Sequence, residues 1–374
     1  MKQHSKQQIA AGMKHLAATV ALLLGVTSCG MMEDDLSDCP QELRVDFKYD
    51  MNMKFADALS HEVKTITLYA YDHNGRLALE KQDRVADIIN RGGYMTVNEL
   101  MPGDYTLKVW AEGDVRYADS YIFGRPETRA GEISVLTSRI NRSERTVNHD
   151  ITSLYHGLNA TADLNLKGYG VKTASVDLTK DTNVIRVVLQ NASGKRLNAD
   201  DFDFFIDDDN SFLAYDNTPL TRSNFAKESG ISPAPDALPE DSITYRPWSV
   251  YDGIVGSDHK IKAHSGASTT RADGDTETKM SAVVAEFTVN RLFMEKHPRL
   301  RVVNRSDGKT VFNIPMKDYI LLVKGNYNHQ MTDQEYLDRE DTYDFVFFID
   351  DNHTWLSASI YINSWRVVLQ SSEL

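Results

Sequence analysis

The stretch LRVDFKYDM, residues 43–51, alternates apolar and polar side chains over consecutive positions. Side chains of a β-strand point alternately to opposite faces of a sheet, so this period of two predicts a strand with one buried face. The apolar face consists of Leu43, Val45, Phe47, Tyr49 and Met51. The first regular segment of the chain is therefore expected to cover a hydrophobic core as a β-strand.

Similar short apolar segments follow along most of the chain. Residues 65–71 and 76–79 flank Asp72-His73-Asn74-Gly75, and an Asn-Gly pair between alternating segments is typical of a tight hairpin turn. Helix signals are scarce, and the clearest is at residues 332–340, with Thr332 as the N-cap. Many short strands separated by turn residues favour an all-β fold built from β-sandwiches.

The strand pattern stops near residue 168 and then begins again. Gly168 and Gly170 lie in a polar connection, after which residues 174–178 and 184–189 are predicted to form a new strand pair. We therefore expect two sandwiches in tandem, an N-terminal domain at residues 29–167 and a C-terminal domain at residues 168–374.

Two segments of the second half are expected to be long loops. Residues 216–241 contain four prolines, and residues 253–279 are rich in Ser, Thr, Gly and Asp. Loops of this length are uncommon inside compact domains.

The first 28 residues have the layout of a secretory signal peptide. Lysines at positions 2, 6 and 14 precede an apolar stretch at residues 16–26, which is too short to span a bilayer. The following Val26-Thr27-Ser28-Cys29 resembles a bacterial lipobox, which implies cleavage between Ser28 and Cys29 and a covalent lipid on Cys29. The alternative is an ordinary signal peptide, with Cys29 joined to Cys39 in a disulfide.

The charge of the chain limits its partners. The formal net charge is −13, and loss of the three lysines in residues 1–28 brings it to about −16. Such a surface repels nucleic acid and anionic lipid, and no cluster of Lys and Arg interleaved with aromatic residues occurs. We expect no nucleic-acid partner, and membrane attachment through the lipid rather than through a basic patch.

No catalytic motif with the correct spacing is present, so the sequence does not predict an enzyme or a small-molecule substrate. Asp307-Gly308-Lys309-Thr310 lacks the earlier glycine of a phosphate-binding loop, because Val303 stands there. Residues 207–210 and 350–352 group Asp and Asn after aromatic strands, which is typical of hairpin turns; calcium binding is the alternative. We expect no cofactor and no metal.

The end of the chain contains one more apolar segment. Leu356, Ala358, Ile360 and Ile362 share one face, and after Asn363-Ser364 the alternation changes phase, so that Trp365, Val367 and Leu369 become the apolar series. A change of phase predicts a bulge or a jump between sheets at Asn363-Ser364. The last strand, residues 365–374, either completes its own sandwich or adds to the sheet of a neighbouring molecule.

Several motifs occur together in an order that resembles a known family. They are the lipobox, Asp38-Cys39-Pro40, Leu100-Met101-Pro102-Gly103-Asp104-Tyr105, Val176-Asp177-Leu178-Thr179 with Asn183, Tyr245-Arg246-Pro247-Trp248, Gln334-Glu335-Tyr336-Leu337-Asp338 and Ile362-Asn363-Ser364-Trp365. Together they resemble the fimbrial anchor subunits of Bacteroidetes, the minor-fimbrium anchor type among type V pilus proteins. The resemblance implies two transthyretin-like β-sandwiches held to the outer membrane by lipid. The acidic residues Glu33, Asp34 and Asp35 after the lipid resemble a signal for export to the cell surface.

The resemblance also implies a role for each end of the mature chain. The last strand, with Trp365, Arg366, Val367, Val368 and Leu369, would be donated to a fimbrial stalk or accessory subunit. The first strand, with Leu43, Val45, Phe47 and Tyr49, would stay in place and close the groove of the anchor itself. In the family that this sequence resembles, stalk subunits are made as precursors that are cut after an arginine. No Arg or Lys lies between Cys29 and the first strand here, which favours the anchor type.

A surface glycan-binding lipoprotein of a nutrient-uptake system is the alternative function. Such a protein would also be acidic, lipidated and rich in strands, but it needs a platform of exposed aromatic side chains. The candidates are Trp110, Trp248, Trp355 and Trp365, which are far apart in the sequence.

Overall fold

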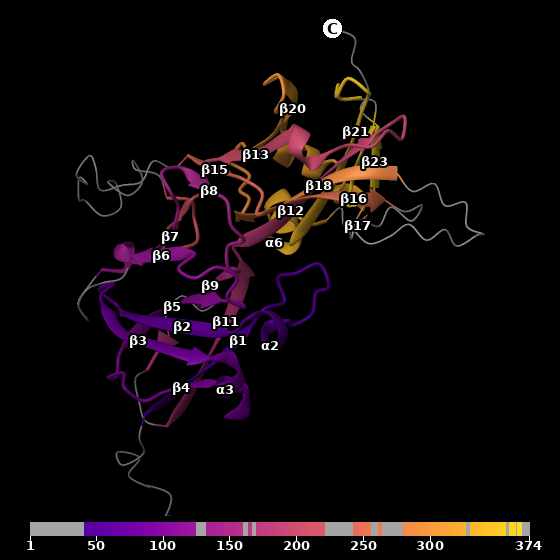
Figure 1. Ribbon diagram of the computed structural model, residues 1–374. Coiled ribbons are helices and arrows are strands. Elements are labelled where there is room, and N and C mark those ends of the chain that lie inside the picture. Colours follow the sequence, from indigo (N-terminus) through magenta and orange to yellow (C-terminus); the bar gives the residue numbers. More distant parts are fainter. Residues whose placement is uncertain are drawn as a thin grey trace, which may run out of the picture.

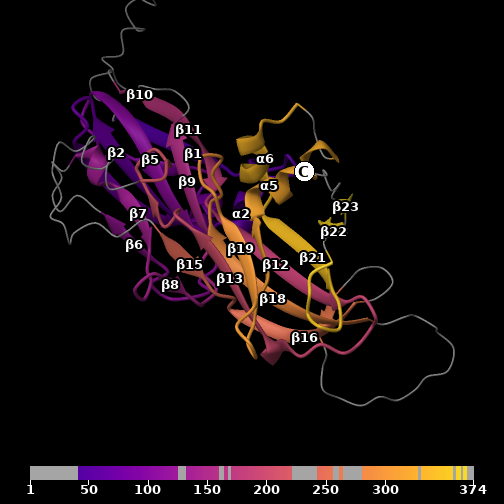
Figure 2. The same ribbon diagram turned by 90° about the horizontal axis from the view of Figure 1, so that it is seen from above.

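The computed structural model describes residues 41–124, 132–159, 164–166, 170–220, 242–255, 261–263, 280–326, 330–356, 359–363 and 365–368. Strands dominate these residues. Figure 1 shows two bodies, one of mainly indigo and purple strands below and one of mainly orange and yellow strands above. Figure 2 shows from above that the two bodies lie side by side and share a long seam.

The N-terminal body is built on one eight-stranded sheet, with the strand order β3-β2-β5-β9-β11-β1-β4 and with β10 paired to β5 outside that order. The bounds are β1 (Glu42–Lys48), β2 (Thr65–Asp72), β3 (Leu77–Arg84), β4 (Met95–Val97), β5 (Asp104–Glu112), β9 (Leu154–Asn159), β10 (Leu164–Asn165) and β11 (Val171–Lys180). Neighbouring strands are antiparallel except for β1 and β11, which run parallel.

The C-terminal body is a sandwich of two sheets. The seven-stranded sheet has the order β17-β16-β18-β12-β21-β22-β23, and the five-stranded sheet has the order β20-β19-β13-β15-β8. The first contains β12 (Thr182–Asn191), β16 (Ser249–Val255), β17 (Ile261–Ala263), β18 (Met280–Asn290), β21 (Thr342–Ile349), β22 (Ser359–Ile362) and β23 (Trp365–Val368). The second contains β8 (Thr146–Val147), β13 (Phe202–Asp208), β15 (Ile243–Tyr245), β19 (Arg299–Asn304) and β20 (Thr310–Pro315).

A three-stranded sheet, β14-β7-β6, connects the two bodies. It consists of β6 (Tyr121–Gly124), β7 (Thr137–Ile140) and β14 (Phe212–Leu213). Tyr121, Ile140 and Leu213 of this sheet belong to the core of the C-terminal sandwich, and that core also takes in Tyr69 and Tyr71 of β2. Ile66 and Leu68 of the same strand belong to the N-terminal core. The N-terminal sheet is thus buried on both faces at β2, which fixes it to the second domain.

Helices are few and short in the described part of the chain. They are α2 (Leu59–Glu62), α3 (Val85–Asn90), α5 (Met316–Leu321) and α6 (Asp333–Arg339), with 3-10 turns η2 (Ile133–Val135), η3 (Ala199–Asp201) and η4 (Lys324–Asn326). Among the described residues, no helix is both long and apolar enough to cross a membrane.

The strand directions give the two ends of the described chain opposite positions. β1 and β11 both run toward Asp181, where the chain passes from the N-terminal sheet into β12 of the C-terminal sandwich. β21 runs parallel to β12, and two antiparallel steps through β22 give β23 that same direction, away from the N-terminal domain. The chain therefore enters at the far end of one domain and leaves toward the far end of the other (Figure 1).

The main sequence predictions of the fold are confirmed. The chain is all-β with two sandwich domains in tandem. β2 and β3 form the predicted hairpin, in which Gly75 has a positive φ of 71°. The helix at the predicted position is α6, and the Thr332 side chain caps it by accepting a hydrogen bond from the Glu335 N–H at 3.1 Å.

The predicted strand pair at residues 174–178 and 184–189 is wrong. These residues belong to β11 and β12, which lie in different sheets on either side of Asp181. The polar connection near residue 168 leads into the N-terminal sheet instead of joining two domains, so the sheets change at Asp181 and not at residue 168. The physical reason is the pairing of β11 with β1, from the start of the chain.

The expected loops are only partly described. Within residues 253–279, the end of β16 pairs with β17 in the seven-stranded sheet, so this part of the expected loop is strand. Most of residues 216–241 lie outside the described residues, as do residues 256–260 and 264–279.

The burial of β1 predicts which substitutions weaken the N-terminal domain. Val45→Ala removes two methyl groups from a site with no exposure, and should lower the free energy of unfolding by about 2 kcal/mol. Val171→Ala is the matched control, because Val171 lies on the adjacent strand β11 and is 52% exposed; its cost should be about 0.5 kcal/mol or less. Chemical denaturation measures both, and equal losses would contradict the assignment of the core.

Candidate functional site: the two chain ends and the domain junction

The first strand is enclosed in its sheet on both sides. β1 pairs with β11 from Glu42 to Lys48 and with β4 from Leu43 to Val45. All four side chains predicted to close the groove are buried, namely Leu43, Val45, Phe47 and Tyr49. The N-terminal domain thus completes its sheet with a strand of its own chain.

Arg44 is the first basic residue after Cys29, and it lies inside this ladder. Its Nε donates to Glu42 Oε1 at 2.5 Å, and its guanidinium lies 4.6 Å from the centre of the Tyr94 ring. A protease needs an extended, accessible backbone, so cleavage after Arg44 requires β1 to leave the sheet first.

The last described strand has the opposite environment. Among the described residues, β23 is the outermost strand of its sheet and pairs only with β22, through four residue pairs. Trp365, Arg366, Val367 and Val368 form it, and Arg366 is exposed. Leu369, the remaining residue of the predicted donor strand, lies outside the described residues.

The predicted bulge or sheet jump at Asn363-Ser364 is wrong, because the chain turns back there into a β22–β23 hairpin. Ile362 pairs with Trp365, and Asn363 has a positive φ of 48°. The Asn363 N–H donates to the Asp344 carbonyl oxygen, and its side-chain oxygen accepts from the Asp344 N–H at 2.8 Å. The change of phase seen in the sequence thus marks a reversal within one sheet.

The N-terminal segment is not part of the described structure. Ser28, Cys29 and Cys39 all precede residue 41, where the description begins. Lipidation of Cys29 and cleavage after Ser28 remain predictions from the sequence.

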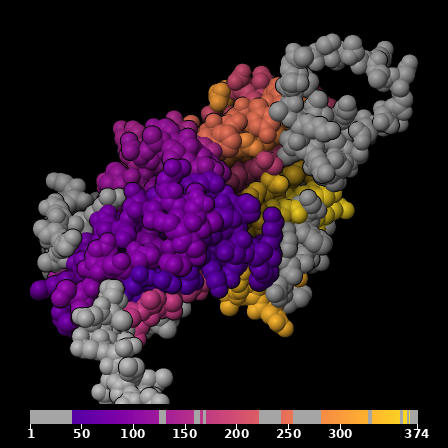
Figure 3. Space-filling model, turned by 90° about the horizontal axis from the view of Figure 1, so that it is seen from below, coloured from indigo at the N-terminus to yellow at the C-terminus, as the bar shows by residue number. Residues whose placement is uncertain are grey.

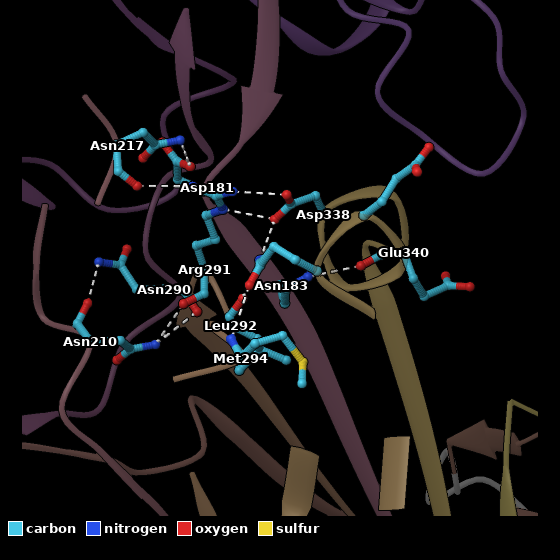
Figure 4. Close-up of polar contacts among 12 residues, drawn as sticks. Asp181, Asn183, Asn210, Asn217, Asn290, Arg291, Leu292, Met294, Asp338 and Glu340 are labelled. Atoms are coloured by element: carbon cyan, nitrogen blue, oxygen red, sulfur yellow. Dashed lines mark hydrogen bonds and ion pairs between the residues drawn. The ribbon is translucent and has the colours of Figure 1, made fainter. Parts of the chain in front are cut away.

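A buried polar cluster surrounds Asp181, where the chain passes from the N-terminal sheet into the C-terminal sandwich (Figure 4). The Asp181 side chain has no exposure and accepts a hydrogen bond from Asn217 Nδ2 at 2.8 Å. Arg291, at the end of β18, donates from Nε and Nη2 to the two carboxylate oxygens of Asp338, each at 2.8 Å, and from Nη1 to the Asn217 carbonyl oxygen. Asn183 Nδ2 donates to the Glu340 carbonyl oxygen at 2.8 Å.

The prediction of a hairpin turn at residues 207–210 is wrong, because β13 and β14, on either side, lie in different sheets; these residues belong to the junction instead. Asn210 is fully buried, and its Nδ2 donates to the carbonyl oxygens of Asn290 and Arg291, each at 3.0 Å. Asn290 Nδ2 returns a bond to the Asn210 carbonyl oxygen. At residues 350–352 the turn prediction holds, since Asp350 Oδ1 accepts from the Asn352 N–H. No group of His, Cys, Asp and Glu in the described ranges is arranged to hold a metal ion.

The tryptophans are divided between core and surface. Trp110 is buried in the core, and Trp355 packs against Phe312 and Phe347. Trp248 is 38% exposed, and nothing is described for the side chain of Trp365. Because Trp110 serves the core, it contributes nothing to an exposed aromatic platform.

Burial dominates the electrostatics of the junction. It raises the pKa of Asp181 from 3.8 to about 7, against the opposing effects of Arg291 and Asn217. Burial lowers the pKa of Arg291, but its hydrogen bonds to Asp338 outweigh this effect and leave it raised. Arg291 therefore keeps its charge, while burial brings the pKa of Asp181 close to neutral pH.

Sequence reasoning assigned no role to the junction residues. Asn183 and Asp338 occurred in motifs that carried the family resemblance, but Asp181, Asn217 and Arg291 were not singled out. The sequence does contain one indication of the junction. Polar residues that follow a strand with alternating apolar side chains occur at domain junctions as well as at turns. The partner residues are too distant along the chain to be paired by inspection.

The two tandem sandwiches and their differently paired ends define a structural protein of the fimbrial anchor type. A family model described as "Fimbrillin-A associated anchor proteins Mfa1 and Mfa2" matches residues 36–231 and 232–371. The chain belongs to this family, which confirms the resemblance found in the sequence. It is therefore a fimbrium-associated protein of the cell surface, from a family of structural proteins that assemble with other fimbrial subunits.

Solved structures share the fold of this chain. A candidate adhesin from Bacteroides thetaiotaomicron is 26% identical, with a TM-score of 0.69, over 90% of this chain and 100% of that one. A protein from the same organism, described as a candidate polysaccharide-binding protein, is 25% identical, with a TM-score of 0.68, over 88% and 98%.

The fimbrial anchor protein Mfa2 from Porphyromonas gingivalis shares the fold at 18% identity, with a TM-score of 0.59, over 89% of this chain and 100% of that one. No curated protein matches the sequence significantly.

The buried carboxyl of Asp181 predicts a pH dependence of stability. Its folded-state pKa of about 7 lies above the ordinary value of 3.8, so the folded protein keeps a proton that the unfolded chain releases. This contribution to stability is complete below about pH 4 and is lost as the pH rises through about 7.

In the Asp181→Asn variant the side chain is neutral at every pH. The slope of the unfolding free energy against pH should therefore become flatter between pH 5 and 7, by about 1 kcal/mol per pH unit. Denaturant titrations at several pH values measure the slope. Asp307→Asn is the control, because hydrogen bonds from Lys309 lower the pKa of that exposed carboxyl, and its titration falls outside this window. Identical slopes for wild type and Asp181→Asn would contradict the assignment.

Proposed function

We propose that this protein is the lipid-anchored base subunit of a type V fimbrium. It is attached to the outer membrane through Cys29 and exposed at the cell surface. It joins the fimbrial shaft to the membrane and terminates or limits assembly through strand donation. In this function the donor strand begins at Trp365, and the acceptor is a stalk or accessory subunit.

The observation that carries the proposal is the different pairing of the two end strands. β1 has a neighbour on each side and contributes four buried side chains to the core, so the N-terminal domain offers no open groove at that position. In the part of the chain that the structure describes, β23 has one neighbour and a short ladder. An edge strand of this kind is a natural site for pairing with another chain.

The positions of the two ends support the same function. β1 begins at the end of the N-terminal domain far from the junction, and β23 runs away from the junction in the other domain. A base subunit requires this arrangement, because its membrane attachment and its shaft must lie on opposite sides.

Removal of residues 365–374 tests strand donation. The truncated protein should reach the cell surface with an unchanged melting temperature of its N-terminal domain, because β23 is an edge strand. Cells that carry it should shed fimbriae into the medium, which immunoblots of cells and supernatant measure.

Two point variants sharpen this test. Val367→Asp places a charge in the apolar series of the strand and should also cause shedding, whereas Arg366→Ala, on the exposed side, should not. Normal retention of fimbriae by both the truncation and Val367→Asp would rule out donation by this strand.

Cys29→Ala tests the lipid anchor. Without the thiol no lipid can be attached, so the protein should move from the detergent phase to the aqueous phase in a phase partition of whole cells. Cys39→Ala is the matched control and should stay in the detergent phase. Unchanged partition of Cys29→Ala would place the attachment elsewhere.

A further inference from the structure

The end of the first strand is in contact with the second domain. Tyr49 is fully buried one residue after β1, and its hydroxyl donates to the carboxylate of Asp341 at 3.2 and 3.3 Å. Asp341 directly precedes β21 of the C-terminal sandwich. The Tyr49 ring also meets Tyr155 of β9 edge to face, with ring centres 5.1 Å apart.

Helix α6 holds the backbone that follows β1. Arg339, at the end of α6, donates from Nη1 to the carbonyl oxygen of Asp50 at 3.0 Å and to that of Asn52 at 3.4 Å. Its guanidinium lies 4.3 Å from the centre of the Phe55 ring, and its Nε donates to Glu335 at 2.8 Å. Charge-assisted bonds of this kind are about twice as strong as neutral ones.

A lysine of the N-terminal sheet connects these contacts. Lys180, the last residue of β11, donates from Nζ to Glu62 at 2.9 Å and to Asp341 at 3.2 Å. Its own side chain is 13% exposed. Asp341 therefore receives donors from both strands of the parallel pair, Tyr49 after β1 and Lys180 at the end of β11.

Packing alone does not seal this seam. A cavity of about 470 Å³ opens along it, lined from one side by residues 52–62 and from the other by Arg339, Glu340 and Asp341. Figure 3 shows the indigo residues of the first domain against yellow residues of the C-terminal segment on the face seen from below. The directional polar contacts therefore add to the packing of Tyr49 in restraining the end of β1.

We infer that Asp341 and Arg339 of the second domain form a latch that holds the first strand in the sheet of the first domain. β1 can leave its ladder only after the Tyr49 hydroxyl and the Asp50 carbonyl have lost their partners across the seam. Retention of β1 is therefore a property of the docked pair of domains and not of the N-terminal sheet alone. The inference does not depend on lipidation or on strand donation.

Trypsin digestion of the full-length protein in detergent tests the latch. Cleavage after Arg44 produces a new chain beginning at Val45, which quantitative mass spectrometry can follow, and it requires β1 to open. Arg339→Gln combined with Asp341→Asn should raise the rate of this cleavage at least tenfold, although both substitutions lie in the other domain. Tyr49→Phe, which removes only the hydroxyl, should raise it by a smaller factor.

Two internal measurements distinguish a latch from general destabilisation. Lys317 is 5% exposed in the second domain, so cleavage after it reports global unfolding and should change by less than twofold. Arg305→Gln is the matched control variant, because it breaks an ion pair with Asp203 at 2.9 Å that lies at the far end of the same domain. It should leave cleavage after Arg44 unchanged. An unchanged Arg44 rate in the double variant, or a parallel rise after Lys317, would overturn the inference.

Discussion

The parallel pairing of β1 with β11 is the constraint on which the rest of the structure depends. It joins the first strand of the described chain to the last strand of the N-terminal sheet, residue for residue from Glu42–Val171 to Lys48–Asp177. It also points both strands at Asp181, where the chain passes directly into the second sandwich. Closure of the first domain and the position of the second domain therefore follow from one ladder.

The junction shows how buried polar groups between apolar cores fix one arrangement of the chain. Arg291 contacts Asp338 and Asn217, and Asn217 donates to Asp181, so the residue at which the chain leaves the N-terminal sheet is fixed to the C-terminal sandwich. Breaking a buried pair by removing one partner is far more costly than any single surface contact. Tyr69 and Tyr71 bury apolar surface against the second core. The directional bonds of the polar cluster allow only one position of the chain at the junction.

Local patterns in the sequence predicted local structure well, and long-range pairing was beyond them. The alternation in residues 43–51, the Asn74-Gly75 turn and the Thr332 cap each depend on neighbours within a few positions, and each is observed. The domain boundary was misplaced because β11 pairs with a strand about 130 residues earlier, which no local pattern records. The junction was missed for the same reason, since an Asp or Asn after a strand resembles a turn until its distant partner is known.

The entry and exit of the chain at opposite ends have a mechanical meaning. A pull applied at Glu42 and at the far end of the second domain loads β1 from its beginning and β11 from its end. In a parallel pair this is shear, in which the evenly spaced hydrogen bonds of the ladder share the load and must fail together. The β22–β23 hairpin, at the edge of its sheet, has a shorter ladder of four residue pairs to resist the same tension, against seven in the β1–β11 pair. Under tension the β1–β11 ladder would therefore stay intact longer than the β22–β23 hairpin at the other end of the molecule.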